Sequence, residues 1–185
     1  MASRLILVAT NAEADAFNAW MAEQLPGEMQ VVLASNTVAQ TARDNAVIPP
    51  EVLATLNPSC MPPHKLHLKP GVVLILLRNI DVDQGLCNGA RLTLEQVTRH
   101  TLKCRILGGA RHGNLALLPK LTFTPSDTVA APCEFRRRPF PVRVAFALTI
   151  NKSQGQTLDH VGVYLRSPIF AHGHLYVALS RCTDP

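Results

Sequence analysis

The chain has 185 residues, of which 47% are apolar, and it carries a formal net charge of +5. This length is sufficient for one sizeable hydrophobic core, or for one core and a small satellite domain. The amino-terminal run MASRLILVATNAEADAF lacks the pattern of a signal peptide, and no window approaches the ~18 uninterrupted apolar residues of a membrane span. We therefore expect a soluble, intracellular protein with no membrane partner.

The chain has five cysteines, an odd number, and none of them form a C-x-x-C pair. This pattern indicates reduced thiols in a cytosolic or nuclear protein. Cys60, His64 and His67 are close in sequence, but no fourth ligand stands at a suitable spacing and the neighbouring prolines favour a spacer. We therefore expect no metal site there, nor at His172 and His174.

Positive charge is concentrated in the middle of the sequence. Residues 1–68 have three basic and six acidic side chains, whereas residues 69–155 have thirteen basic and five acidic ones. The middle of the chain could therefore bind an anionic polymer. A solvated basic face of an ordinary domain is the alternative, and charge alone does not separate the two.

The first 35 residues predict a β-α-β unit with parallel strands. The run from Arg4 to Ala9 is short and continuously apolar, which is typical of a strand covered on both faces. Thr10 and Glu13 have the spacing of a capping box, which predicts the start of a helix. One face of that helix would carry Phe17, Trp20, Met21 and Leu25. A second strand is expected at Val31–Ala34.

Thr10 and Asn11 would lie at the carboxyl end of the first strand, where ligands bind in parallel sheets. They are either simple helix caps or polar contacts for a docked ligand. Farther along, Pro49-Pro50 predicts the start of another short helix.

From residue 69 the pattern changes to short strands separated by turns. Strands are expected at residues 72–77, 91–97, 102–107 and 115–118, with tight-turn signals at Asn88-Gly89 and Gly108-Gly109. They suggest a small, partly open β-barrel inserted into an α/β domain. The predicted organisation is residues 1–68 for the first part of the α/β domain, 69–138 for the barrel, and 139–185 for the second part.

The return from the barrel carries Arg136, Arg137 and Arg138. A solvated charge run at a domain junction is favoured for these three residues over a contact with DNA. After them, a buried strand is expected at Val142–Ile150, followed by a strand at Val161–Leu165 and a helix at His172–Arg181.

The strand at Val142–Ile150 leads into the polar run Asn151-Lys152-Ser153-Gln154-Gly155. Such a loop can present backbone N–H groups to phosphate. An arginine after it, here Arg181, is a common partner of a γ-phosphate. The alternatives are a helix-end arginine that satisfies carbonyl groups, and a solvated loop lysine at Lys152. Because no strand follows the last helix, the sheet is expected to be incomplete.

Four stretches, in this order and spacing, resemble motifs of superfamily-one DNA helicases of the Pif type (petite integration frequency). LILVATNAEADAFN resembles motif IV, and PPHKLHLKPGVVLILLRNIDVDQGLCNGARL resembles the entry to the inserted barrel of that family. FPVRVAFALTINKSQGQTLDHVGVYL resembles motif V, and HGHLYVALSR resembles motif VI. The helicase region of Helitron transposons is especially similar.

The resemblance covers most of the chain and implies the C-terminal part of an ATP-dependent DNA helicase. The implied fold is α/β: a second RecA-like motor domain, with a parallel sheet and flanking helices, that carries an inserted Src-homology-type barrel and is truncated at its C-terminus. The implied roles are in DNA repair, recombination or transposition. The implied location is nuclear or cytoplasmic, with a mitochondrial one for the full-length family.

The resemblance also implies roles for individual residues. Arg181 would be the arginine finger that stabilises charge on the γ-phosphate. The nucleotide would be bordered by Gln154, Gly155 and Gln156. Single-stranded DNA would be contacted, or coupled to ATP, by Thr10, Asn11, Thr149, Asn151, Lys152 and Ser153.

The chain has no G-x-x-x-x-G-K-[ST] run and no Asp-Glu pair after a strand. The seat for ATP and Mg²⁺ is therefore expected in a missing N-terminal RecA-like domain, and we expect no ATP hydrolysis by these residues alone. Two alternatives stay open: a non-catalytic module that binds single-stranded nucleic acid, and a non-functional transposon remnant.

Overall fold

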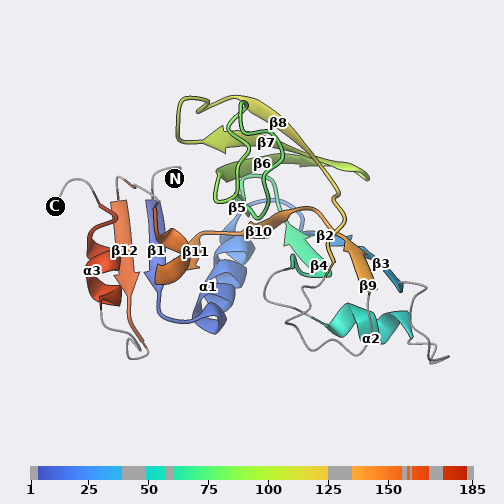
Figure 1. Ribbon diagram of the computed structural model, residues 1–185, viewed down its shortest axis with the longest axis horizontal. Coiled ribbons are helices and arrows are strands. Elements are labelled where there is room, and N and C mark those ends of the chain that lie inside the picture. Colours follow the sequence, from blue (N-terminus) through green and yellow to red (C-terminus); the bar gives the residue numbers. More distant parts are fainter. Residues whose placement is uncertain are drawn as a thin grey trace.

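The computed structural model describes residues 4–38, 49–56, 61–124, 135–155, 158, 160–166 and 173–182. These residues form a small parallel sheet with two helices, a larger antiparallel sheet, and a third region of two short strand pairs beside a helix (Figure 1). None of the helices that they form is long and apolar enough to cross a lipid bilayer.

The parallel sheet has the strand order β11-β1-β12. Its strands are β1 (Arg4–Val8), β11 (Ala147–Thr149) and β12 (His160–Tyr164). Leu5 and Leu7 pack on one side with Ala178 of helix α3 (His174–Leu179), whereas Val8 packs on the other side with Ala14 of helix α1 (Asn11–Gln24). Because side chains alternate along β1, the two helices cover opposite faces. The expected parallel sheet with flanking helices is confirmed.

Helix α1 begins at the predicted capping box. The Thr10 N–H donates to Glu13 Oε2 at 3.1 Å, and the Glu13 N–H donates to Thr10 Oγ1 at 3.3 Å. Of the predicted apolar face, Phe17, Met21 and Leu25 pack partly buried against the core, but Trp20 is 54% exposed, and the fully buried residues are Ala14, Asn18 and Ala22. Small residues occupy this face since α1 lies close against β11.

The antiparallel sheet has the strand order β10-β5-β6-β7-β8. Its strands are β5 (Val73–Leu76), β6 (Arg91–Val97), β7 (Thr101–Leu107), β8 (Leu115–Pro119) and β10 (Val142–Val144). Four of them match the predicted barrel strands. Their buried side chains form the largest hydrophobic cluster, which also takes in Phe140, Phe146 and the end of α1 at Ala22.

The predicted β-α-β unit is wrong. Strand β2 (Gln30–Leu33) pairs antiparallel with β4 (Lys65–Leu68) and does not join β1. Val31 and Leu33 are about half exposed, at 50% and 53%, and only Val32 on the other face packs against the core, so this strand is not covered on both faces as a central parallel strand would be. Strand β3 (Ser35–Val38) pairs with β9 (Phe135–Arg138), beside helix α2 (Pro50–Thr55), which starts at the predicted Pro49-Pro50.

The predicted strand Val142–Ile150 is divided between the two sheets. Its first part, β10, pairs antiparallel with β5, and its second part, β11, pairs parallel with β1. Ala145 and Phe146 between them are buried, and Ile150–Ser153 forms a short 3-10 helix. The two sheets are therefore joined by a connection of only two residues.

Candidate nucleic-acid interface

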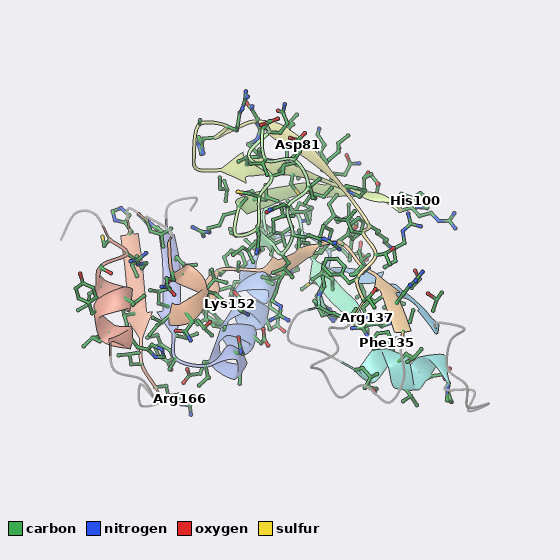
Figure 2. The ribbon with its side chains drawn as sticks, viewed as in Figure 1. Asp81, His100, Phe135, Arg137, Lys152 and Arg166 are labelled. Atoms are coloured by element: carbon green, nitrogen blue, oxygen red, sulfur yellow. The ribbon has the colours of Figure 1, made fainter. Side chains whose placement is uncertain are left out.

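Lys152 and Asn11 are brought together at the carboxyl ends of two neighbouring strands. The Lys152 ammonium donates to Asn11 Oδ1 at 3.2 Å, although the residues are 141 positions apart in sequence. Asn11 starts α1 directly after β1, and Lys152 lies in the 3-10 helix directly after β11. Figure 2 shows Lys152 where β11 meets α1. The structure thus joins residues of the two stretches that resemble motifs IV and V.

Burial lowers the pKa of Lys152, and the positive charge of Arg143 lowers it further, whereas Asp15 raises it. Lys152 remains accessible at the surface and lies near another cation, so an added anion would stabilise its charged form. The side chain is therefore suited to a phosphate contact.

The other predicted residues of this loop divide into accessible and buried ones. Asn151 is exposed, whereas Thr149 is buried at the end of β11. Ser153 is completely buried, and its hydroxyl donates to the Ile150 carbonyl at 2.7 Å. In this structure Ser153 therefore holds the 3-10 helix closed and does not face solvent.

Gln154 and Gly155 are exposed at the exit of the loop. Gly155 has a φ of 81°, in the left-handed region that favours glycine, so the chain can turn sharply there. Gln156, the third residue predicted to border a nucleotide, lies outside the described residues.

An open cleft of about 1280 Å³ lies between the loop and the antiparallel sheet. One wall carries Lys152, Gln154 and Gly155, and the opposite wall comes from residues 82–91 and 106–112. The basic side chains that line it are Arg91, Arg111, Arg143 and Lys152, against the single carboxylate of Asp83. The cleft is therefore lined by more positive than negative charge, of which the Arg91 guanidinium is buried and bonded to the Arg4 carbonyl.

Arg181 lies just after α3 and bends back over it. Its Nε donates to the Val177 carbonyl at 3.0 Å, and Nη2 donates to Ser180 Oγ at 3.1 Å. Its own carbonyl accepts from the Leu158 N–H at 3.0 Å, which ties the end of α3 to the segment after the loop. The carbonyl contact expected of a helix-end arginine is therefore present.

Arg137 fits neither interpretation of the arginine run, because it is part of neither a solvated charge run nor an exposed contact for DNA. It is completely buried, whereas Arg136 and Arg138 are exposed. Its Nη2 donates to the carbonyls of Leu53 and Leu56 at 2.7 and 2.8 Å, at the end of α2. Figure 2 shows Phe135 and Arg137 on β9 beside α2. Side chains alternate between the two faces of a strand, so Arg137 is buried while Arg136 and Arg138 on either side of it point outward. This alternation was the sequence signal for the burial of Arg137.

Asn18 is a residue of this region that the sequence patterns did not single out. It is buried on α1, and its side-chain amide bonds to both main-chain groups of Ala147 on β11. A polar residue in the middle of a helix, within the stretch that resembles motif IV, was the available signal.

Within the described part of the chain, no group of three or more His, Cys, Asp or Glu side chains could hold a metal ion. Cys60 and His172 lie outside that part. His64 is instead within 3.3 Å of Asn36 Nδ2, and its pKa is lowered by burial and by the nearby charges of Arg137 and Lys65.

Comparison with known proteins identifies relatives of this arrangement. Residues 51–97, which span most of α2 and all of β4, β5 and β6, match the family model "DNA helicase Pif1, 2B domain". The human ATP-dependent DNA helicase PIF1 is 36% identical over 135 residues, which cover 71% of this chain and 20% of that protein. The Xenopus laevis helicase of the same name is 31% identical, over 88% of this chain and 23% of that protein. The chain thus spans about a fifth of these relatives.

Solved structures show the same fold. The crystal structure of Pif1 helicase from Candida albicans covers 98% of this chain with a TM-score of 0.72 and 26% identity, and 43% of that chain is matched. Bacteroides Pif1 bound to ssDNA covers 97% of this chain, with 38% of its own length matched, a TM-score of 0.68 and 22% identity. The similarity to Helitron helicases stays a prediction. By sequence and by fold, this chain belongs to the Pif1 family of DNA helicases.

Proposed function

We propose that this chain is the strand-gripping and ATP-sensing part of an ATP-dependent DNA helicase. In this proposal the three-stranded parallel sheet, with α1 and α3, belongs to the second RecA-like motor domain. The five-stranded sheet is the inserted Src-homology-type barrel. A further RecA-like domain, outside these 185 residues, would supply the phosphate loop and the ligands of Mg²⁺.

The contact between Lys152 and Asn11 carries the proposal. It places an ammonium group and an amide at the carboxyl edge of the parallel sheet, on the wall of a cleft lined by three further arginines. Phosphates of single-stranded DNA would bind there mainly through charge, with Asn11, Thr10 and Asn151 as polar contacts. Two of the Pif1 neighbours were solved with ssDNA, one of them also with ADP-AlF3, which supports the binding of both a strand and a nucleotide by proteins of this fold.

On the nucleotide side, Arg181 would act as the arginine finger, and Gln154, Gly155 and Gln156 would border the nucleotide. For this role the Arg181 guanidinium would leave the carbonyl of Val177 and turn toward the γ-phosphate. Its planar set of donors suits phosphate oxygens. The residues of this chain do not by themselves seat ATP, so we expect no turnover from the chain alone.

DNA binding can be tested with the full chain and a labelled oligo-dT. We expect binding that weakens as salt rises, because each phosphate contact releases counterions. Lys152→Met should weaken binding several-fold and reduce the magnitude of the salt slope by about 0.7, the value for one contact with a single strand. Lys65→Met removes an exposed lysine on β4, away from the cleft, and serves as the control.

Absence of binding at 20–50 mM salt, or an equal loss in both variants, would contradict the proposed interface. ATP turnover is measured separately on the same preparation, with and without DNA. Robust turnover that Arg181→Ala abolishes would show that the chain is catalytically complete. DNA binding without turnover, even after the longer protein is reconstituted, would favour a non-catalytic binding module.

A further inference from the structure

Strand β8 ends the antiparallel sheet, and no other strand in the described part of the chain pairs with its outer side. In Figure 1 it lies on the side of this sheet that faces away from β1 and β12. It pairs with β7 from Thr101↔Pro119 to Arg105↔Leu115. An edge of this kind offers main-chain donors and acceptors to another strand.

The register shows which main-chain groups point outward. The Ile106 N–H donates to the Asn114 carbonyl at 2.9 Å, which makes this a hydrogen-bonded pair. Hydrogen-bonded and non-hydrogen-bonded pairs alternate along an antiparallel ladder. The pairs Arg105↔Leu115 and Lys103↔Leu117 therefore belong to the second kind, and the N–H and C=O groups of Leu115 and Leu117 point away from β7.

The same two residues expose their side chains. Leu115 is 54% and Leu117 65% exposed, whereas Ala116 and Leu118 between them are buried in the core. A groove of about 550 Å³ borders this strand and is lined in part by Leu86, Gly113, Leu115 and Leu117. β8 itself carries no charged residue, and charged residues are a common protection of free edges.

The charged side chains beside β8 indicate the chemical class of the partner that this edge could bind. Lys103 and Arg105 on β7 lie opposite Leu117 and Leu115, and they share the carboxylate of Glu95 on β6. Two cations facing one carboxylate leave a net positive charge. Strands β6, β7 and β8 contain no aromatic residue, so this face offers no ring on which bases could stack. An acidic peptide fits these features better than a single-stranded nucleic acid does.

We propose that the outer edge of β8 binds an extended acidic segment of a partner protein, which adds to the sheet as a sixth strand. Main-chain bonds to Leu115 and Leu117 would hold the segment. Every second side chain of the segment would lie on the exposed face of the sheet, and along that face apolar groups would pack on the two leucines while carboxylates would pair with Lys103 and Arg105. This inference does not depend on the DNA-binding role of the cleft.

The test uses the full chain and the fluorescein-labelled peptide Val-Thr-Glu-Thr-Val-Thr-Glu-Thr-Val, which as a strand presents its Val and Glu side chains on one face, with binding followed by anisotropy. We expect Leu117→Pro to weaken binding at least tenfold, because proline removes an outward N–H and leaves the bonds to β7 in place. Leu117→Glu should do the same, because its carboxylate repels those of the peptide and the apolar contact is lost, and it covers the case in which the proline variant fails to fold. Leu179→Glu replaces an equally exposed leucine on α3 and should bind like the wild type.

Three results would overturn the proposal. The first is absence of peptide binding to the wild type, or equal binding of the same peptide with Lys in place of Glu. The second is loss of oligo-dT binding in Leu117→Pro, which would make this edge part of a nucleic-acid surface. The third is a wild-type dimer in sedimentation that Leu117→Glu converts to a monomer, which would make a second copy the occupant.

Discussion

The side-chain amide of Asn18 completes the free edge of β11 at Ala147. Nδ2 donates to the Ala147 carbonyl at 3.0 Å, and the Ala147 N–H donates to Oδ1 at 2.8 Å. These are the two bonds that a neighbouring strand would make, and here a helix supplies them. The helix that carries Asn11 is thereby held in register with the strand that leads to Lys152.

Replacing Asn18 should therefore destabilise the fold. In Asn18→Ala the buried N–H and C=O of Ala147 lose their partners, and we expect a loss of about 3 kcal/mol in the free energy of unfolding. Urea denaturation measures it. Gln96→Ala, which removes an exposed amide on β6, should change the free energy by less than about 0.5 kcal/mol. A small effect of Asn18→Ala would mean that water replaces the amide.

Asn18→Asp gives a further test with a pH readout. A carboxylate can accept from the Ala147 N–H, but it repels the carbonyl oxygen, whereas the protonated carboxyl can donate to it. The pKa of the new carboxyl should thus be raised in the folded state, and the stability of this variant relative to wild type should increase as pH falls. A pH-independent difference would contradict this account.

Arg137 should be the critical member of the arginine run. Arg137→Met removes the donors to the carbonyls of Leu53 and Leu56 and to Asn36 Oδ1, which lies 2.9 Å from Nε. We expect a loss of at least about 3 kcal/mol in stability. Arg138→Met, at the next position and exposed, should cost almost nothing. If both variants behaved alike in thermal unfolding, the run would be a solvated charge cluster after all.

Arg91 should couple the two sheets. Its guanidinium Nη2 donates to the Arg4 carbonyl at 2.8 Å, so a residue of the antiparallel sheet bonds to the first residue of β1. Arg91→Met should cost about 2 kcal/mol, as expected for a partly buried bond from a charged donor. It should also speed amide hydrogen exchange in β1 more than in β7. Arg99→Met, at the exposed turn between β6 and β7, is the control.

Cys104 should be inert in the native protein. It is completely buried, and burial, with a further contribution from Glu95, raises the pKa of its thiol to about 12. Maleimide should therefore label Cys104 only after unfolding. Because the folded state holds this proton more tightly, its contribution to stability is complete below pH 9 and is lost as pH rises toward 12. Cys104→Val should remove that part of the pH dependence, and rapid native labelling would contradict the assignment.

Local patterns predicted most of the strands and helices because each depends on nearby residues. The run at Arg4–Val8 and the capping box of Thr10 and Glu13 are examples. Strand pairing depends on residues far apart, so the partnership of β2 with β4 could not be predicted from Val31 and Leu33. The same holds for the site: its loop was evident from the sequence, but the contact between Lys152 and Asn11 depends on the parallel order of β1 and β11.

The number of basic residues in the middle of the sequence also exceeds the positive charge that is accessible at the surface. Lys69 and Arg137 are buried, and both donate to carbonyls at the ends of helices; the Lys69 ammonium bonds to the carbonyls of Glu23 and Leu25 at 3.0 and 2.9 Å. Helix ends leave such carbonyls without partners inside the helix. Part of the positive charge in the middle of the chain therefore stabilises the fold, and a charge count overestimates what is available to DNA.

The division of one extended segment into β10 and β11 has a mechanical consequence. Only Ala145 and Phe146 separate the two strands, and both are buried, so this connection is short and packed within the protein. A torque on the antiparallel sheet passes along the main chain directly into the 3-10 helix that carries Lys152. A rotation of the antiparallel sheet would therefore displace the Lys152 ammonium group directly.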